Sequence, residues 1–177
     1  IENYQELRSR LSSRHKFTSD TDSEVVSHLI EDYMELGVPL EEAVPRVTKE
    51  LKGSYAILAV STKEPEKIVA ARKDSPLVVG VGTGGNFVAS DTLSFLEETN
   101  RVIFIEDGES VVVTREKVSL LDNDGRVIRR KPKEVNWKWD EATKGGHDFF
   151  MLKEIQEQPQ AIRRALMQDE DLIMEMA

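Results

Sequence analysis

The chain of 177 residues has the length of about one domain, and its 39% hydrophobic and 32% charged residues are ordinary for a globular protein. Its 24 basic and 33 acidic side chains give a net charge of −9, which argues against nucleic acid or an anionic membrane as the main partner, because both would repel it. The absence of cysteine excludes disulfides, zinc sites of the cysteine type and a thiol nucleophile within this sequence, and no stretch approaches the ~20 apolar residues of a membrane span.

The first third of the chain has the residue spacing of amphipathic helices. Apolar residues three and four positions apart predict helices over Tyr4–Arg14, from about Val25 to Met34, and over about Leu40–Leu51. Pro45 lies inside the third pattern, where proline kinks a helix or delays its start.

The second predicted helix has clear signals at both ends. Thr21 and Glu24 have the spacing of a capping box, in which each side chain accepts a hydrogen bond from the backbone N–H of the other residue. Gly37 and Pro39 are expected to end this helix.

From Ser54 onward, short apolar runs separated by turn residues predict β-strands. The predicted strands are Ser54–Val60, Lys67–Arg72, Leu77–Val81, Asn86–Ser90, Arg101–Glu106, Glu109–Thr114, Val118–Leu121 and Arg126–Arg130. The nearly continuous apolar runs Ala56–Val60 and Val102–Ile105 are typical of strands buried on both faces. The pattern therefore predicts an α+β domain, in which helices pack on a mainly antiparallel sheet backed by a second sheet.

The character of the chain changes again after Arg130. The segment Lys131–Gly146 is charged, contains Trp137 and Trp139, and lacks a clear period, so we expect a linker or a strap on the surface. A helical pattern returns over Phe149–Met167, and Pro159 is expected to interrupt it. Because this last segment has few apolar partners within the chain, we expect it to dock on something outside the chain.

One glycine-rich segment matches a nucleotide-binding pattern by its letters. Gly80 to Gly85 fits G-x-G-x-x-G, which holds pyrophosphate only where a helix follows directly. The next residues, Asn86–Ser90, have the pattern of a strand. We therefore interpret the segment as a hairpin and reject nucleotide binding.

The remaining chemistry-bearing side chains give weak signals. His15, His28 and His147 share no ligand spacing, so we expect structural or surface roles for them and no metal site. No serine lies in a G-x-S-x-G elbow, which leaves a hydrolase of that type without support. The lysines of Lys131–Lys133 lie near two tryptophans, but the acidic residues among them favour a solvated strap over a nucleic-acid site.

Asp22 is the candidate for ligand binding. It lies where the second helix is predicted to start, and a carboxylate there gains ~0.3–1 kcal/mol from the helix dipole, so helix stabilisation alone accounts for it. The same fixed anion would suit an ammonium group. The residue pattern leaves both roles open.

Several elements resemble class II glutamine amidotransferase domains, in particular those of the glutamine–fructose-6-phosphate aminotransferase family. Phe17-x-Ser19-x-Thr21-Asp22-Ser23-Glu24-Val25 is similar to the S-x-T-D-[ST]-E-V element of these domains. Ile1–Tyr4 resembles the residues that directly follow their H-N-G signature. The likeness continues, in the same order as in the family, over Leu51–Ala56, Ala71–Leu77, Asn86–Asp91 and Phe150–Pro159.

The resemblance implies an N-terminal-nucleophile hydrolase fold, an αββα sandwich of antiparallel sheets, incomplete here at its N-terminus. In the family, an N-terminal cysteine attacks the side-chain amide of glutamine, the H-N-G segment stabilises the oxyanion, and ammonia passes to a sugar-phosphate isomerase domain without a metal or organic cofactor. The aspartate that matches Asp22 binds the α-ammonium group of L-glutamine. This sequence lacks the cysteine and the H-N-G segment, so we assign it no catalytic residue and expect it to be inactive alone.

The resemblance also implies an organisation. Residues 1–146 correspond to the later part of the glutaminase domain, and residues 147–177 to the linker or first helix toward the isomerase domain. Because the chain starts at Ile1, we expect a piece of a longer protein, with the upstream segment and the isomerase domain as partners. Unpaired sheet edges would favour a homo-oligomer or a co-purifying upstream fragment. With no targeting signal in the sequence, we expect a cytoplasmic location.

Two alternatives stay open. The first is another class II amidotransferase, of the asparagine- or purine-pathway type, although the segment Lys153–Pro159 resembles the inter-domain junction of the sugar enzyme. The second is a non-catalytic remnant that binds glutamine or a partner subunit as a regulator.

Overall fold

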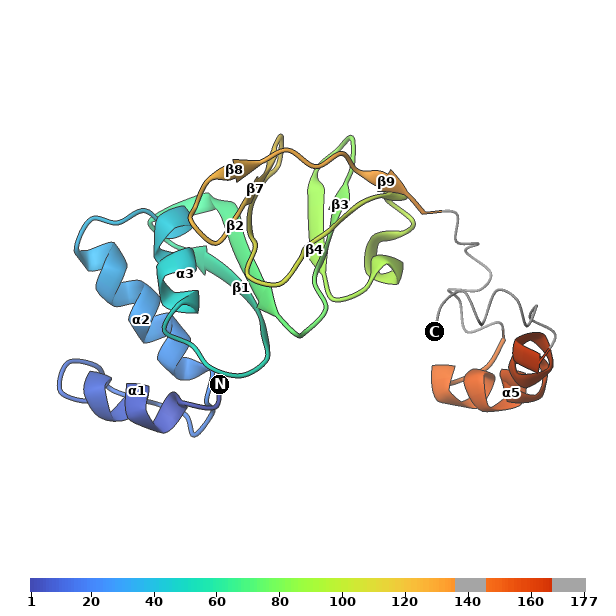
Figure 1. Ribbon diagram of the computed structural model, residues 1–177, viewed down its shortest axis with the longest axis horizontal. Helices are drawn as coiled ribbons and strands as arrows, with labels where there is room; N and C mark the ends of the chain where they lie inside the picture. Colours follow the sequence, from blue (N-terminus) through green and yellow to red (C-terminus); the bar gives the residue numbers. More distant parts are fainter. Residues whose placement is uncertain (136–145, 167–177) are drawn as a thin grey trace. The chain divides into compact units, whose positions relative to one another are not determined.

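The computed structural model describes residues 1–135 and 146–166, which belong to two compact units, Ile1–Val135 and Asn136–Ala177. The first unit is an α+β domain, in which three helices precede two antiparallel sheets (Figure 1), as the sequence predicts. Trp137 and Trp139 lie outside the described residues. Among the helices of the described ranges, none is long and apolar enough to cross a membrane.

The three predicted helices form with shorter ends. They are α1 (Tyr4–Leu11), α2 (Glu24–Glu35) and α3 (Leu40–Thr48). The helix α3 starts at Leu40 and contains Pro45, so the proline does not delay its start. The backbone N–H of Leu40 donates to Oε2 of Glu64 at 2.8 Å, which satisfies one of the donors that a helix start leaves free.

All eight predicted strands form, and they divide between two sheets. The five-stranded sheet has the order β1 (Tyr55–Ser61), β2 (Glu64–Lys73), β6 (Ser110–Thr114), β7 (Val118–Leu121) and β8 (Val127–Ile128). The four-stranded sheet has the order β4 (Asn86–Ala89), β3 (Val78–Val81), β5 (Arg101–Phe104) and β9 (Lys133–Glu134). The strand β9 corrects the prediction for Lys131–Gly146, because it lies inside this expected linker or strap and pairs with β5.

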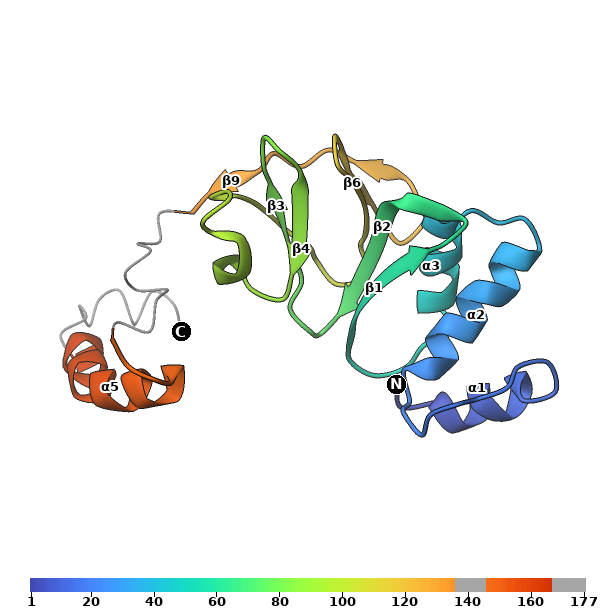
Figure 2. The same cartoon turned by 180° about the vertical axis from the view of Figure 1, so that it is seen from behind.

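The two faces of β2 build two hydrophobic cores. Val69 and Ala71 lie in the core shared with the helices, whereas Ala70, between them, lies in the core shared with the second sheet. This alternation follows from the two-residue period of a strand. Helices, five-stranded sheet and four-stranded sheet therefore form successive layers, which Figures 1 and 2 show from opposite sides.

The glycine-rich hairpin is confirmed. The strands β3 and β4 pair antiparallel, and no helix follows them directly. The short 3₁₀ helix η1 (Thr92–Phe95) comes next and places Phe95 against the outer face of this sheet. A Cβ at Gly80 would lie 2.6 Å from the Phe95 ring, so this position requires glycine.

Burial of β1 on both faces is a wrong prediction. Leu58 is 49% exposed and Val60 is 72% exposed. The cause is position: β1 is an edge strand whose inner side chains, Ile57 and Ala59, meet the helices, while no described element covers the opposite face. In β5, Phe104 is likewise 44% exposed.

The described part of the second unit is dominated by α5 (Phe150–Leu166). Pro159 lies inside this helix, so the predicted interruption is wrong. Several of its apolar side chains are exposed in the chain, among them Met151, Ile155 and Ile162. Docking of this helix on a partner stays a prediction.

Candidate functional site

Three segments that are far apart in the sequence meet around Asp22. The start of the chain lies against the loop before α2, because the backbone nitrogen of Ile1 contacts the Asp22 carboxylate. The next residue is tied to the segment after α3, since the Glu2 N–H donates to the Lys52 carbonyl at 2.9 Å.

The Asn3 side chain also binds the start of the chain to the segment after α3. Its Nδ2 donates to the Glu50 carbonyl and its Oδ1 accepts from the Lys52 N–H, both at 2.9 Å. A side-chain amide that is bound at both its oxygen and its nitrogen holds the two backbone segments in one arrangement.

Gly53 allows the start of the chain to approach the segment after α3 closely. Its φ of +94° lies in the left-handed region, which L side chains rarely adopt. A Cβ there would also lie 2.8 Å from Cγ of Glu2 and 3.3 Å from the Glu2 backbone nitrogen. A glycine at this position is therefore required both by its conformation and by the space available.

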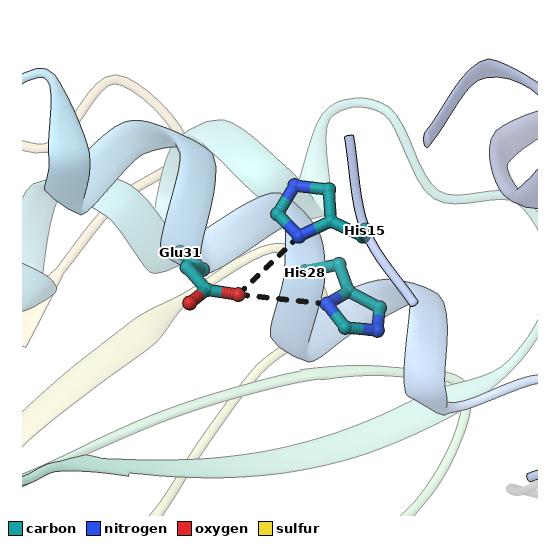
Figure 3. Close-up of side chains that lie close together, drawn as sticks. All are labelled: His15, His28 and Glu31. Carbon is teal, nitrogen blue, oxygen red and sulfur yellow. Dashed lines mark ion pairs between the residues drawn. The ribbon is translucent and has the colours of Figure 1, made fainter. Parts of the chain in front are cut away.

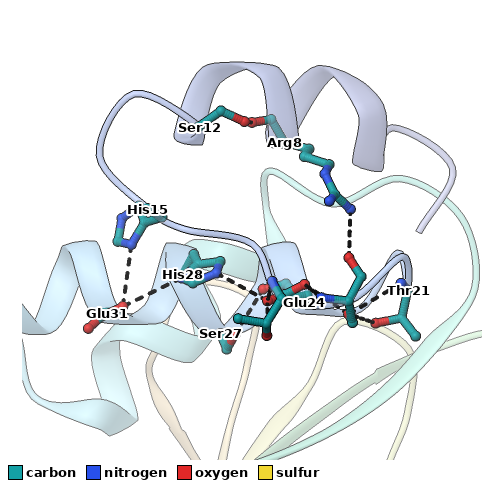
Figure 4. Close-up of polar contacts among 10 residues, drawn as sticks. Arg8, Ser12, His15, Thr21, Glu24, Ser27, His28 and Glu31 are labelled. Carbon is teal, nitrogen blue, oxygen red and sulfur yellow. Dashed lines mark hydrogen bonds and ion pairs between the residues drawn. The ribbon is translucent and has the colours of Figure 1, made fainter.

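The loop that carries Asp22 is organised by Glu24 (Figure 4). The Glu24 carboxylate accepts from the backbone N–H groups of Thr18 and Ser19 at 2.7 and 2.9 Å, and from their hydroxyls at 3.0 and 2.8 Å. The hydrogen bond from the Thr18 backbone, followed by those from Ser19, lowers the pKa of Glu24 to about 2. The carboxylate is therefore ionised at neutral pH.

The predicted capping box is wrong. The helix α2 begins at Glu24 after Ser23, and no side chain caps it. Glu24 reaches back to Thr18 and Ser19 rather than to Thr21, because the loop folds over so that their donors meet the carboxylate. The Thr21 hydroxyl instead lies 2.8 Å from Oγ of Ser19.

The loop is also held from α1. The guanidinium of Arg8 donates to the Ser19 carbonyl at 3.0 Å and lies 4.6 Å from the centre of the Phe17 ring. Phe17 in turn meets the ring of His28 edge to face at 4.7 Å. Side chains from α1 and α2 thus fix the backbone on which Asp22 sits.

Asp22 itself is half-exposed, with 46% of its side chain accessible. The structure thus holds an accessible carboxylate on a loop that is braced by Glu24 and Arg8.

A groove lies next to this loop, between α2 and β1. It begins at Ser23 and is lined by Val26, Ile30, Leu58 and Val60, among others. Because the sequence analysis predicted that Leu58 and Val60 are buried, it did not indicate this groove.

Two of the three histidines come together, which the sequence spacing does not reveal. The ring centres of His15 and His28 lie 4.6 Å apart. His15 belongs to the loop after α1 and His28 to α2, and only the reversal of the chain between these helices makes them neighbours.

Comparison with known proteins identifies relatives. A family model described as a glutamine amidotransferase domain matches residues 1–97. A protein of Methanothermobacter thermautotrophicus, named glutamine–fructose-6-phosphate aminotransferase (isomerizing), is 46% identical over 174 residues, which are 98% of this chain and 29% of that protein. Proteins of the same name from Thermococcus kodakarensis and Salmonella typhimurium are 42% identical, over 100% and 94% of this chain and 30% and 27% of their own lengths. The chain thus spans about three tenths of the length of the curated relatives it matches.

Proposed function

Because the chain belongs to the glutamine amidotransferase family, we propose that it forms part of the glutaminase domain of a glutamine–fructose-6-phosphate aminotransferase. In this proposal the complete enzyme hydrolyses glutamine and uses the ammonia to make glucosamine 6-phosphate from fructose 6-phosphate. Residues 1–146 belong to the glutaminase domain and residues 147–177 lead toward the sugar isomerase domain. The similarity over nearly the whole chain supports this assignment.

The proposed fold is the αββα sandwich of N-terminal-nucleophile hydrolases. It is supported by the two antiparallel sheets that share a core, with helices on the outer face of one sheet. On the outer face of the other sheet, the described residues contribute η1. In this proposal, segments outside the described residues complete the helix layer on this face of the sandwich.

The observation that carries the proposal is the environment of Asp22. Its carboxylate is half-exposed and is held on a loop that Glu24 fixes through Thr18 and Ser19. The α-ammonium group of L-glutamine is a cation that such a fixed, accessible carboxylate can hold. Asp22 therefore binds it by a charge-assisted hydrogen bond and rejects ligands that lack the amine.

The nucleophile has to come from outside this sequence. The chain contains no cysteine, and a glutaminase of this family attacks the amide through a cysteine thiolate. The chain alone is therefore inactive in this proposal, and its partners are glutamine, the polypeptide that carries the cysteine, and the isomerase domain.

The test is Asp22→Asn in the complete enzyme. Asparagine keeps the shape but removes the charge, so the Michaelis constant for glutamine should rise by at least ~10-fold, while the free energy of unfolding changes by at most ~1 kcal/mol. Asp20→Asn is the matched control, because Asp20 is an exposed aspartate of the same loop and should leave the constant unchanged. An unchanged Michaelis constant in Asp22→Asn would defeat the proposed role.

The absence of cysteine also favours one rival function, a non-catalytic module that binds glutamine or a partner subunit. The sequence of the gene on the 5′ side of the codon for Ile1 separates the two. A cysteine codon after the initiator methionine, with an H-N-G segment ending at this junction, supports the enzyme. A start codon at this position supports the binding module.

A further inference from the structure

A cluster of two histidines and one carboxylate lies between the loop after α1 and the helix α2 (Figure 3). Nδ1 of His15 lies 3.4 Å and Nδ1 of His28 lies 3.5 Å from the same oxygen of Glu31. Each residue offers one ligand atom, and the three atoms lie within 4.8 Å of one another. An ideal tetrahedron with bonds of ~2.1 Å separates its ligand atoms by about 3.4 Å. Two of the three separations already have this value.

A second carboxylate, that of Asp32, holds the His15 ring from the side opposite Glu31. Nε2 of His15 lies 2.7 Å from Oδ1 of Asp32. An ionised carboxylate only accepts hydrogen bonds, so Nε2 donates to Asp32, and Nδ1 is the ring nitrogen that faces Glu31. A carboxylate behind a histidine in this way orients the ring and makes it a better metal ligand.

His28 has a similar arrangement but no hydrogen bond. Its Nε2 lies 3.7 Å from Glu24, and both of its ring nitrogens are buried without a hydrogen-bond partner among the described residues. A buried polar atom without a partner costs free energy, and a ligand at Nδ1 would remove that cost. The edge contact with Phe17 holds the ring in place.

The charges around the cluster favour a cation. Glu31, Asp32 and Glu24 contribute three carboxylates within contact distance of the two rings, and Arg14 compensates one of them through its contact with Asp32 at 2.7 Å. The Glu31 side chain is 55% exposed, which leaves a path from solvent to the cluster.

We propose that His15, His28 and Glu31 bind a divalent transition-metal ion, of which Zn²⁺ fits best. Two imidazole nitrogens and one carboxylate oxygen form a donor set that zinc accepts, with a fourth position left for water. The hard oxygen-seeking ions Mg²⁺ and Ca²⁺ fit poorly because two of the three donors are nitrogens. The bound ion would join α2 to the loop between α1 and α2, which also carries Asp22.

The test uses the full chain with Zn²⁺ for affinity and Co²⁺ as a spectroscopic probe. The chain should bind one ion, its thermal midpoint should rise with metal concentration, and bound Co²⁺ should show the strong visible absorption of a four-coordinate site. His28→Gln and Glu31→Gln should each weaken binding by ~100-fold or more, since loss of an outer partner alone costs ~10–100-fold.

The variants are chosen so that misfolding does not decide the result. Glu31→Gln changes an exposed side chain, and Glu35→Gln, one turn later on the same helix and also exposed, is its matched control. His147→Gln removes the third histidine and should leave affinity unchanged. The proposal is overturned if Zn²⁺ shifts no thermal midpoint, or if Glu31→Gln and Glu35→Gln bind the metal equally well.

Discussion

Single residues determine whether the Asp22 loop keeps its shape, and Gly53 is one of them. Its positive φ and its approach to Glu2 leave no room for a side chain. Glu2 follows Ile1, whose backbone nitrogen contacts Asp22. A change at Gly53 therefore acts on the geometry of the site without touching Asp22.

Gly53→Ala should lower the free energy of unfolding by about 1–3 kcal/mol, because alanine is strained at this φ. Gly84→Ala is the control, since a Cβ there meets nothing within 4 Å and the backbone has no positive φ. Urea unfolding of both variants measures the difference. Equal stability of the two variants would contradict the account of Gly53.

The sequence predicts some roles of single residues and misses others. The spacing predicted that Glu24 pairs with Thr21 in a capping box, which is wrong, because its actual partners Thr18 and Ser19 reach it only through the fold of the loop. The contact between His15 and His28 could not be predicted from their spacing either, because it also depends on how the chain folds back between α1 and α2. Asp22 was found through a resemblance, and its ligand role stays a proposal.

At the scale of elements, a strand side chain supports a helix. Glu64 of β2 accepts from the first backbone N–H of α3 and lies 2.7 Å from Nζ of Lys67. The hydrogen bond from Lys67 and that from the Leu40 N–H hold the pKa of Glu64 below its usual 4.5. One carboxylate thus joins α3 to β2 of the five-stranded sheet.

Glu64→Gln should lower the free energy of unfolding at pH 7 by about 1 kcal/mol. A pKa that is lower in the folded state contributes stability above pH 4.5, and this contribution is lost as the pH falls through the folded value. The gap between wild type and Glu64→Gln should therefore narrow below pH 4.5. Glu66→Gln, an exposed glutamate of the same strand, should show no such gap at any pH. Parallel curves for wild type and Glu64→Gln across this range would contradict the pairing.

Elements with a strong local pattern could be predicted, and those that depend on a neighbour could not. Apolar spacing placed the helices and the eight predicted strands to within a few residues. The strand β9 has two residues and exists only through its pairing with β5. The apolar run in β1 is typical of a strand covered on both faces, but coverage depends on neighbouring elements, and β1 is an edge strand.

At the scale of the molecule, the order of the strands within each sheet could not be predicted from local sequence patterns. Pairs such as β3 with β4 adjoin in the sequence, whereas β2 with β6 bridges a long stretch of chain. Among the described strands, each sheet has two open edges, at β1 and β8 in one sheet and at β4 and β9 in the other. Leu58 and Val60 are exposed on β1. Pairing of these edges with an upstream segment or with a second copy stays a prediction.

We propose that this chain supplies the part of a glutaminase site that binds the amine of glutamine, and that the cysteine nucleophile lies in other polypeptide. The most direct measurement is ammonia release from glutamine by the purified 177-residue chain and by the complete protein that contains it. The complete protein should release ammonia at enzymatic rates, and the chain alone should not exceed the buffer. Enzymatic release by the chain alone, or none by the complete protein, would contradict the claim.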